Sequence, residues 1–227
     1  MNESESNALI THQIYLVRHG KVDVPAGVCY GQLNCEVSAG FEAEQARLVH
    51  YFNKASLLES MAHSSPIIMS SPLKRCDQLA QALKQALDSQ SDRTFKTQLY
   101  SNDAFKEINF GDWEGQSWQN IGQDNIESWN NDLVDYRFPN GESTRSFDSR
   151  VINAWNELKV QLAGEMNSKT VIIITHAGVI RSILSYFLHI PLQHSLLLNI
   201  DKLSVSHLKI SPQYEALSRC LVINNPL

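Results

Sequence analysis

Three short apolar runs in this sequence each end at residues that can bind or attack a phosphoryl group. An arginine offers a planar fork of N–H groups, which holds two phosphate oxygens at once and stays charged at any relevant pH. A histidine is partly neutral and nucleophilic near neutral pH, and the phosphoramidate that it forms is readily hydrolysed. The runs Ile14–Val17, Ile67–Met69 and Val171–Ile174 are followed, in that order, by Arg18, His19 and Gly20; by Ser71 and Arg75; and by His176 and Ala177.

These residue types suit the hydrolysis of a phosphate monoester. The reaction needs an in-line nucleophile, charge neutralisation on the equatorial oxygens and a proton for the leaving alkoxide. His19 is the predicted nucleophile, and Arg18 and Arg75 are predicted to hold the phosphoryl group. His176 stands before an expected helix start, where it is predicted to act as a charged phosphate clamp. Gly20 lacks a side chain and is expected to let phosphate approach the backbone.

The proton donor is expected at Glu107, in a loop-like segment. This residue lies near the start of 102–137, a stretch that is rich in Trp, Asn and Asp and has poor periodicity. We expect 102–137 to form a cap over the site, with Trp113, Trp118 and Trp129 in the core of the cap and not on a base-stacking platform. A carboxyl group at this position can protonate a leaving oxygen.

Alternating strand and helix signals predict how these residues are brought together. Besides the three runs, late strands are expected over 203–206 and 221–223. Apolar residues recur every three or four positions in helices expected near Ser38 to Phe52, over Leu73–Leu87 with Ser71 as cap and Pro72 in the first turn, from Thr144 to Leu162, and over Val179–Leu188. This order predicts an α/β fold with three α/β/α layers and a mostly parallel central sheet, whose ligands gather at the carboxyl ends of the strands.

Composition and charge exclude several classes of protein. The 227 residues are 43% hydrophobic and 19% charged, which suits one globular domain over 1–227 with 1–12 as a tail. A net charge of −5 argues against coating nucleic acid or an anionic membrane. A polar, acidic start and the lack of a long apolar run favour a cytoplasmic location. Four cysteines without a CxxC pair predict reduced thiols, and we expect no metal or other cofactor.

These motifs, taken together, resemble the histidine phosphatase superfamily, also called the phosphoglycerate mutase-like fold. The resemblance runs from about residue 14 to beyond residue 181. It implies a transiently phosphorylated His19, Glu107 as the proton donor, a variable cap, and no metal or organic cofactor. The residues that correspond to the phosphate pocket of this family are Arg18, His19, Arg75 and His176.

Within the superfamily, three further segments are similar to alpha-ribazole phosphatases, which act late in cobalamin synthesis. They are Tyr30 to Gln32, Phe110 to Gly115 and Pro139 to Ser143. The predicted substrate is therefore a small phosphorylated metabolite, with alpha-ribazole 5'-phosphate as the named candidate. The residues predicted to contact substrate or phosphate are Arg18, Gly20, Gln32, Arg75, His176, Ala177, Glu142 and Ser143.

Three places depart from the family pattern, one of them the segment 34–38, which lacks the common acidic and proline-containing pattern. Lys21 stands where the family often has an acidic residue, and Pro25 where many members have an asparagine that touches phosphate. Gln32 or the backbone of 141–143 could replace that asparagine.

Three other functions compete with this one. A broad-specificity phosphatase for other sugar or nucleotide-like monoesters shares much of the same loop chemistry. A phosphotransferring mutase is disfavoured, because such enzymes typically carry basic residues where this chain has Ile108 and Asn109. A silent phosphate-binding module is expected to lose His19 or Glu107, and both are present.

Overall fold

A six-stranded sheet forms the centre of the protein, seen here in a computed structural model that describes residues 10–54, 65–89 and 96–227. The strand order is β3-β2-β4-β1-β5-β6. The strands β1 to β4 run parallel, and β5 runs antiparallel to both β1 and β6. The strands are β1 (His12–Arg18), β2 (Ile67–Ser70), β3 (Gln98–Ser101), β4 (Thr170–Thr175), β5 (Ser204–Ile210) and β6 (Arg219–Pro226). The predicted α/β fold with a mostly parallel sheet is confirmed.

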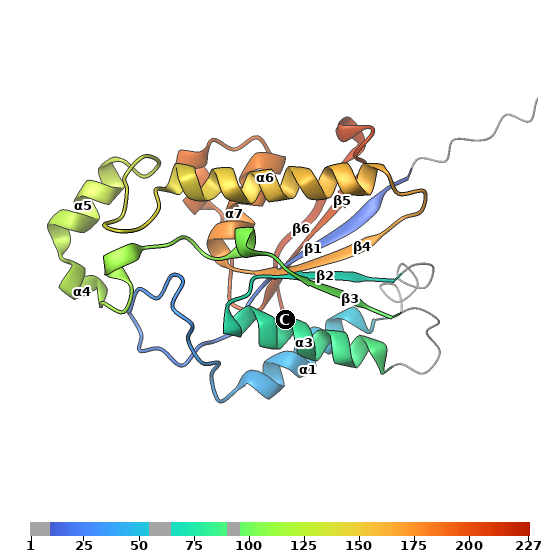
Figure 1. The fold of residues 1–227 in the computed structure, drawn as a ribbon, viewed down its shortest axis with the longest axis horizontal. Coiled ribbons are helices and arrows are strands. Elements are labelled where there is room, and N and C mark those ends of the chain that lie inside the picture. Colours follow the sequence, from blue (N-terminus) through green and yellow to red (C-terminus); the bar gives the residue numbers. More distant parts are fainter. Residues whose placement is uncertain (1–9, 55–64, 90–95) are drawn as a thin grey trace, which may run out of the picture.

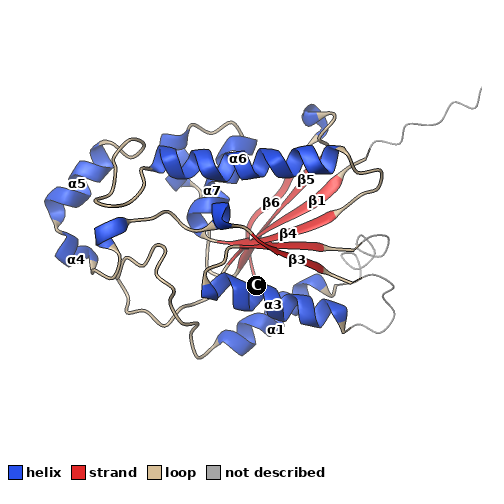
Figure 2. Cartoon of the chain, viewed as in Figure 1, coloured by secondary structure: helices blue, strands red, loops and turns tan. Residues whose placement is uncertain are grey.

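Helices cover the sheet on both faces, as Figures 1 and 2 show. They are α1 (Phe41–Phe52), α3 (Lys74–Asp88), α6 (Thr144–Ala163) and α7 (Ala177–Phe187). Successive side chains of a strand point to opposite faces, so β1 supplies both cores. Ile14 and Leu16 pack with residues of α6 and α7, whereas Tyr15 and Val17 pack with residues of α1 and α3.

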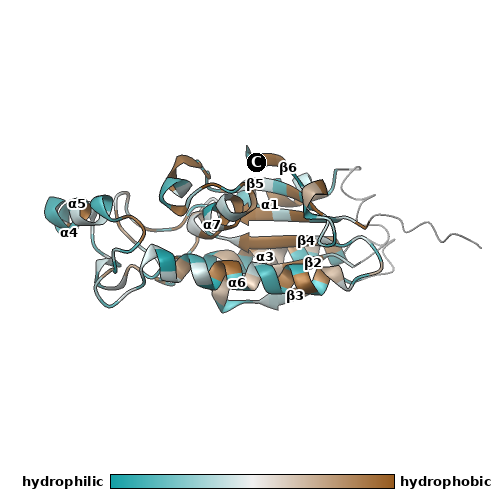
Figure 3. Ribbon diagram, turned by 90° about the horizontal axis from the view of Figure 1, so that it is seen from above, coloured by the Kyte–Doolittle hydropathy of each residue, from teal (hydrophilic) through white to brown (hydrophobic). Residues whose placement is uncertain are grey.

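The central strands were predictable because both of their faces are buried. Every residue of β4 is buried, which explains its uninterrupted apolar run. Figure 3 shows the hydrophobic colouring of these strands. No helix within the described residues is long and apolar enough to span a membrane. All four cysteines are free thiols.

One predicted helix start is wrong. The helix α3 begins at Lys74, with Leu73 as its N-cap in an extended conformation, so Pro72 lies outside the first turn. Ser71 does not cap this helix, because its hydroxyl instead accepts a hydrogen bond from the backbone N–H of Leu73, at 3.3 Å, and contacts a histidine described below. The helix α1, expected to start near Ser38, begins at Phe41.

The predicted cap, 102–137, contains short elements that extend beyond the carboxyl ends of β1 and β4 (Figures 1 and 3). They are η1 (Asp103–Phe105), η2 (Gly111–Trp113), α4 (Trp118–Ile121) and α5 (Gln123–Asn131). Trp113 is buried in an aromatic cluster with Trp129 and Phe138, as expected for a cap core. Trp118 differs, since it is 36% exposed.

The other short elements are η3 (Leu192–Leu197), which follows α7, and η4 (Glu215–Leu217), which precedes β6. Most of the predicted tail, 1–12, lies outside the described residues. Its last residue, His12, is buried as the first residue of β1.

Candidate active site

Three neighbouring parallel strands bring the predicted histidines together. Arg18 pairs with Thr175 in the register of β1 and β4, and Ser70 pairs with Ile174 in that of β2 and β4. The residues that follow these strands therefore meet at one edge of the sheet. The ring centroids of His19 and His176 lie 5.1 Å apart.

His19 is a buried, neutral imidazole with one defined tautomer. Its Nδ1 lies 2.8 Å from the carbonyl oxygen of Gly20. A carbonyl can only accept a hydrogen bond, so Nδ1 carries the proton and Nε2 keeps its lone pair. Burial, and then the charges of Arg75 and Arg18, hold the pKa of His19 well below the ordinary value of 6.5. This form of the ring is a nucleophile at neutral pH.

His176 is also fully buried, as the N-cap residue of α7. Its Nε2 lies 2.8 Å from the hydroxyl of Ser71. Burial, and then the charges of Arg75 and His19, hold its pKa well below 6.5. Without phosphate, desolvation and the nearby guanidinium groups therefore favour the neutral ring, and a charged clamp in the presence of phosphate stays a prediction.

Two guanidinium groups supply the positive charge of the site. Arg75 is 1% exposed and donates to the carbonyls of Leu33, at 2.7 Å, and Gly31, at 2.6 Å. Arg18 donates to the carbonyl of Ile200 at 2.5 Å. Both Nε atoms are buried without a partner among the described residues. No described carboxylate forms an ion pair with either arginine. Arg75 is thus a buried cation and Arg18 a half-buried one, both held by neutral groups, and such a pair favours an anion between them.

Glu107 reaches this edge from the segment after η1. Its Oε1 accepts a hydrogen bond from the backbone N–H of Ile108 at 3.1 Å, and its Oε2 accepts one from that of Gly178 at 3.3 Å. Burial raises the pKa of Tyr30. The charges of Arg18 and Arg75 oppose this rise, whereas the Glu107 carboxylate adds to it. The Tyr30 ring thus lies within the fields of both arginines and of the carboxylate.

Three polar residues predicted to bind phosphate form hydrogen bonds or an ion pair within the protein. Gln32 donates through Nε2 to the carbonyl of Glu107 at 2.8 Å. The carboxylate of Glu142 pairs with Arg150 at 2.7 Å. The hydroxyl of Ser143 caps α6. Phosphate contact by these side chains stays a prediction, and Gln32 already uses one of its two side-chain N–H groups within the protein.

Two small residues complete the predicted set. Ala177 is the buried first residue of α7, directly after His176. A β-carbon on Gly20 would lie 1.8 Å from Oε2 of Glu44, whose carboxylate accepts hydrogen bonds from the backbone N–H of Lys21. The structure therefore gives Gly20 a packing role against a buried carboxylate, distinct from the predicted access for phosphate.

Four residues around the site were not predicted from the sequence, namely Tyr30, Cys76, Arg150 and Arg181. The ring of Tyr30 lies under Arg75, whose guanidinium carbon is 5.2 Å from the ring centroid, and Cys76 Sγ lies 3.5 Å from Nε2 of His176. Arg150 binds the backbone of Glu107, and Arg181 lies within the field of its carboxylate. The motif around Tyr30 was a usable signal for this residue, whereas the contacts of the other three depend on how the helices pack.

The fold and the cluster of two histidines and two arginines define an α/β enzyme that handles phosphate. The sequence matches the histidine phosphatase superfamily (branch 1) over residues 14–222. The chain therefore belongs to this superfamily, as the motifs predicted, and it is a phosphoric monoester hydrolase.

Relatives with different named substrates share this family. The adenosylcobalamin/alpha-ribazole phosphatase of Escherichia coli is 22% identical over 220 residues, which cover 94% of this chain and 99% of that protein. A Hydrogenobacter thermophilus protein named as a phosphoserine phosphatase is 23% identical over 210 residues, or 90% of this chain and 93% of that protein. The solved structure of a mycobacterial glucosyl-3-phosphoglycerate phosphatase has a TM-score of 0.74 and 20% identity, and the match covers 95% of this chain and 99% of that one. That likeness shows the fold alone.

Proposed function

We propose that the protein hydrolyses a small-molecule phosphate monoester through a phosphohistidine formed at Nε2 of His19. One observation carries this proposal. A neutral imidazole, with its proton fixed on Nδ1 by the carbonyl of Gly20, lies in the field of two guanidinium groups that have no carboxylate partner within the described chain. A phosphate dianion fits between such cations and faces the free lone pair.

In the first step, Nε2 of His19 attacks phosphorus while the bond to the leaving oxygen breaks. Arg18 and Arg75 neutralise the equatorial oxygens, and Glu107 gives its proton to the leaving oxygen. The products are a free alcohol and a phosphoryl group on His19. The incoming dianion raises the pKa of His176 and so favours its imidazolium form, which then donates a hydrogen bond to phosphate.

In the second step, water attacks the phosphoryl group and the bond from phosphorus to Nε2 breaks. Glu107, now ionised, takes a proton from that water. Inorganic phosphate leaves, and the enzyme returns to its starting form.

Alpha-ribazole 5'-phosphate is the proposed substrate. The motifs at 30–32, 110–115 and 139–143 and the relative in Escherichia coli support it. A cavity of about 190 Å³ beside Glu107 also supports it, because an acid must face the leaving group. Aromatic residues that suit the aromatic base of this nucleotide line the cavity, namely Phe110, Trp118, Trp129 and Phe147.

A substrate panel tests the proposal. Purified protein would be given alpha-ribazole 5'-phosphate, phosphoserine, sugar phosphates and p-nitrophenyl phosphate, without a phosphorylated primer, and the substrates ranked by kcat/KM. We expect release of phosphate without primer and the highest kcat/KM for alpha-ribazole 5'-phosphate. Turnover only with primer would indicate a mutase, no turnover a binding module, and a flat ranking a broad-specificity phosphatase.

A further inference from the structure

The segment that carries Glu107 has no regular secondary structure, yet side chains hold its backbone. Residues 106–110 lie in neither a helix nor a strand. The hydroxyl of Thr175 donates to the carbonyl of Phe105 at 2.7 Å. Arg150 binds three more carbonyls of this segment, those of Ala104, Lys106 and Glu107. Four successive carbonyls, from the end of η1 to Glu107, therefore have side-chain partners.

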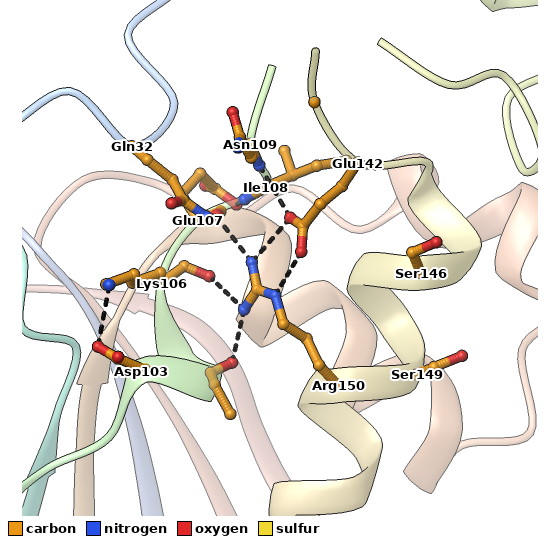
Figure 4. Close-up of polar contacts among 12 residues, drawn as sticks. Gln32, Asp103, Lys106, Glu107, Ile108, Asn109, Glu142, Ser146, Ser149 and Arg150 are labelled. Atoms are coloured by element: carbon orange, nitrogen blue, oxygen red, sulfur yellow. Dashed lines mark hydrogen bonds and ion pairs between the residues drawn. The ribbon is translucent and has the colours of Figure 1, made fainter. Parts of the chain in front are cut away.

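Arg150 uses all five of its N–H groups in hydrogen bonds to these three carbonyls and to the carboxylate of Glu142 (Figure 4). Its Nη1 donates to the carbonyls of Ala104, at 2.8 Å, and Lys106, at 3.0 Å. Its Nη2 donates to the carbonyl of Glu107 at 2.9 Å and to Glu142 Oε2 at 3.0 Å, and its Nε donates to Glu142 Oε1 at 2.7 Å. A guanidinium group has five donors in one plane, so none is left for phosphate.

The carboxyl group of Glu107 depends on this backbone for its position. Within the described part of the chain, its own oxygens accept only backbone hydrogen bonds, of 3.1 and 3.3 Å. The carbonyl of the same residue accepts two strong ones, from Arg150 and from Gln32 at 2.8 Å. Glu142 extends the network to the next residues, because its Oε2 accepts the N–H of Asn109 at 2.9 Å.

We infer that Arg150 is the positioning residue for Glu107, the residue that sets where the carboxyl group meets the leaving oxygen. This inference rests on the proposed function, in which Glu107 is the acid. The helix α6 gives Arg150 a rigid base, because Phe147 and Val151 are buried in the core between this helix and the sheet. The guanidinium carbon lies 4.8 Å from the centroid of the Phe147 ring, which further restricts it.

The test compares two leaving groups in single-turnover phosphorylation of the enzyme. An alkyl phosphate leaves as a basic alkoxide that needs a proton, whereas p-nitrophenyl phosphate leaves as a stabilised phenolate. Arg150→Lys keeps the charge but loses the planar fork. We expect it to slow phosphorylation by the alkyl ester about ten- to a hundredfold, and by the aryl ester less than about threefold. In a Glu107→Gln background the same substitution should add nothing for the alkyl ester.

The control is Arg145→Lys, on the same helix, where the arginine pairs with Asp135 at the surface. It should leave both rates unchanged. Equal slowing of both esters by Arg150→Lys, or no slowing, would overturn the positioning role. If circular dichroism shows that Arg150→Lys does not fold, Glu142→Gln decides by the same comparison, because it removes the ion pair and keeps the shape.

The Glu107 and Arg150 variants together distinguish the acid role of Glu107 from the positioning role of Arg150. If Glu107→Gln slows both esters equally, the acid assigned in the proposed function is wrong. If Glu107→Gln is selective for the alkyl ester and the Arg150 variant is not, the positioning role alone is wrong.

Discussion

A β-carbon built onto Gly178 would lie 2.2 Å from Oε1 of Glu107. The backbone N–H of the same glycine donates to Oε2 at 3.3 Å. The first turn of α7 therefore approaches the carboxyl group as closely as a glycine permits. Because His176 is the N-cap of this helix, one element places both the histidine and the wall against which the acid lies.

Gly178→Ala should move the carboxyl group without unfolding the helix. The closest atom in conflict is the flexible end of the Glu107 side chain, and the Phe147 ring, at 3.1 Å, has to shift by only a few tenths of an ångström. Alanine also stabilises a helix relative to glycine. We expect kcat/KM for an alkyl phosphate to fall about a hundredfold, since such a displacement removes an aligned acid. Steady-state kinetics and thermal denaturation measure this, and Tm should not fall.

Gly164→Ala is the matched control for this substitution. A β-carbon there would meet the carbonyl oxygen of Gln161 at 3.5 Å, an ordinary contact. This variant should keep the activity of the unmodified protein. An active Gly178→Ala enzyme would show that the position of Glu107 does not matter.

Arg75→Lys should impair phosphate binding although the charge remains. Lysine cannot reproduce a fork that bonds Leu33, Gly31 and phosphate together. A hydrogen bond to a charged group contributes about 1.5–3 kcal/mol, so inhibition by vanadate should weaken roughly ten- to a hundredfold. Vanadate titration measures this. Unchanged inhibition would remove Arg75 from the proposed phosphate pocket.

The free energy of unfolding should fall as the pH drops below about 6.5. Burial lowers the folded pKa of both His19 and His176 well below 6.5, so below that pH the unfolded chain binds protons that the folded protein does not. The contribution of these two histidines to the free energy of unfolding is fully present above pH 6.5, and it is lost as the pH falls towards their pKa values in the folded protein. Each histidine should add about 1.4 kcal/mol per pH unit to the slope.

Urea denaturation between pH 7.5 and 5.5 measures this slope. His176→Gln should reduce this slope by the contribution of one histidine, about 1.4 kcal/mol per pH unit. His207, whose pKa burial lowers to about 4, adds to the slope in both proteins. An identical slope in the variant would contradict the neutral state of His176.

The sequence predicted the strands under the site because their burial is visible as apolar runs. The edge strand β3 was missed because most of its residues are exposed, so it lacks such a run. The predicted start of α3 was wrong because a serine followed by proline is typical of a helix N-terminus. The Ser71 hydroxyl instead contacts His176, 105 residues away in the chain.

Sequence motifs also predicted which histidines and arginines meet, since each follows a parallel strand of one sheet. They could not predict that the pKa of His176 is lowered in the protein without phosphate, because this depends on burial and on guanidinium groups that the fold brings there. Nor could they predict Arg150, whose partners at Ala104, Lys106 and Glu107 lie 43 to 46 residues away in the chain.

Trapping the phosphorylated enzyme tests the central claim most directly. Protein mixed with substrate would be quenched in alkaline detergent within one turnover, digested and examined by mass spectrometry. We predict a phosphoryl group on His19 that is stable in base and lost in acid, and that is absent from a folded, inactive His19→Ala variant. A hydroxylamine-sensitive phosphoryl group on a carboxylate, or turnover that persists in His19→Ala, would contradict the account.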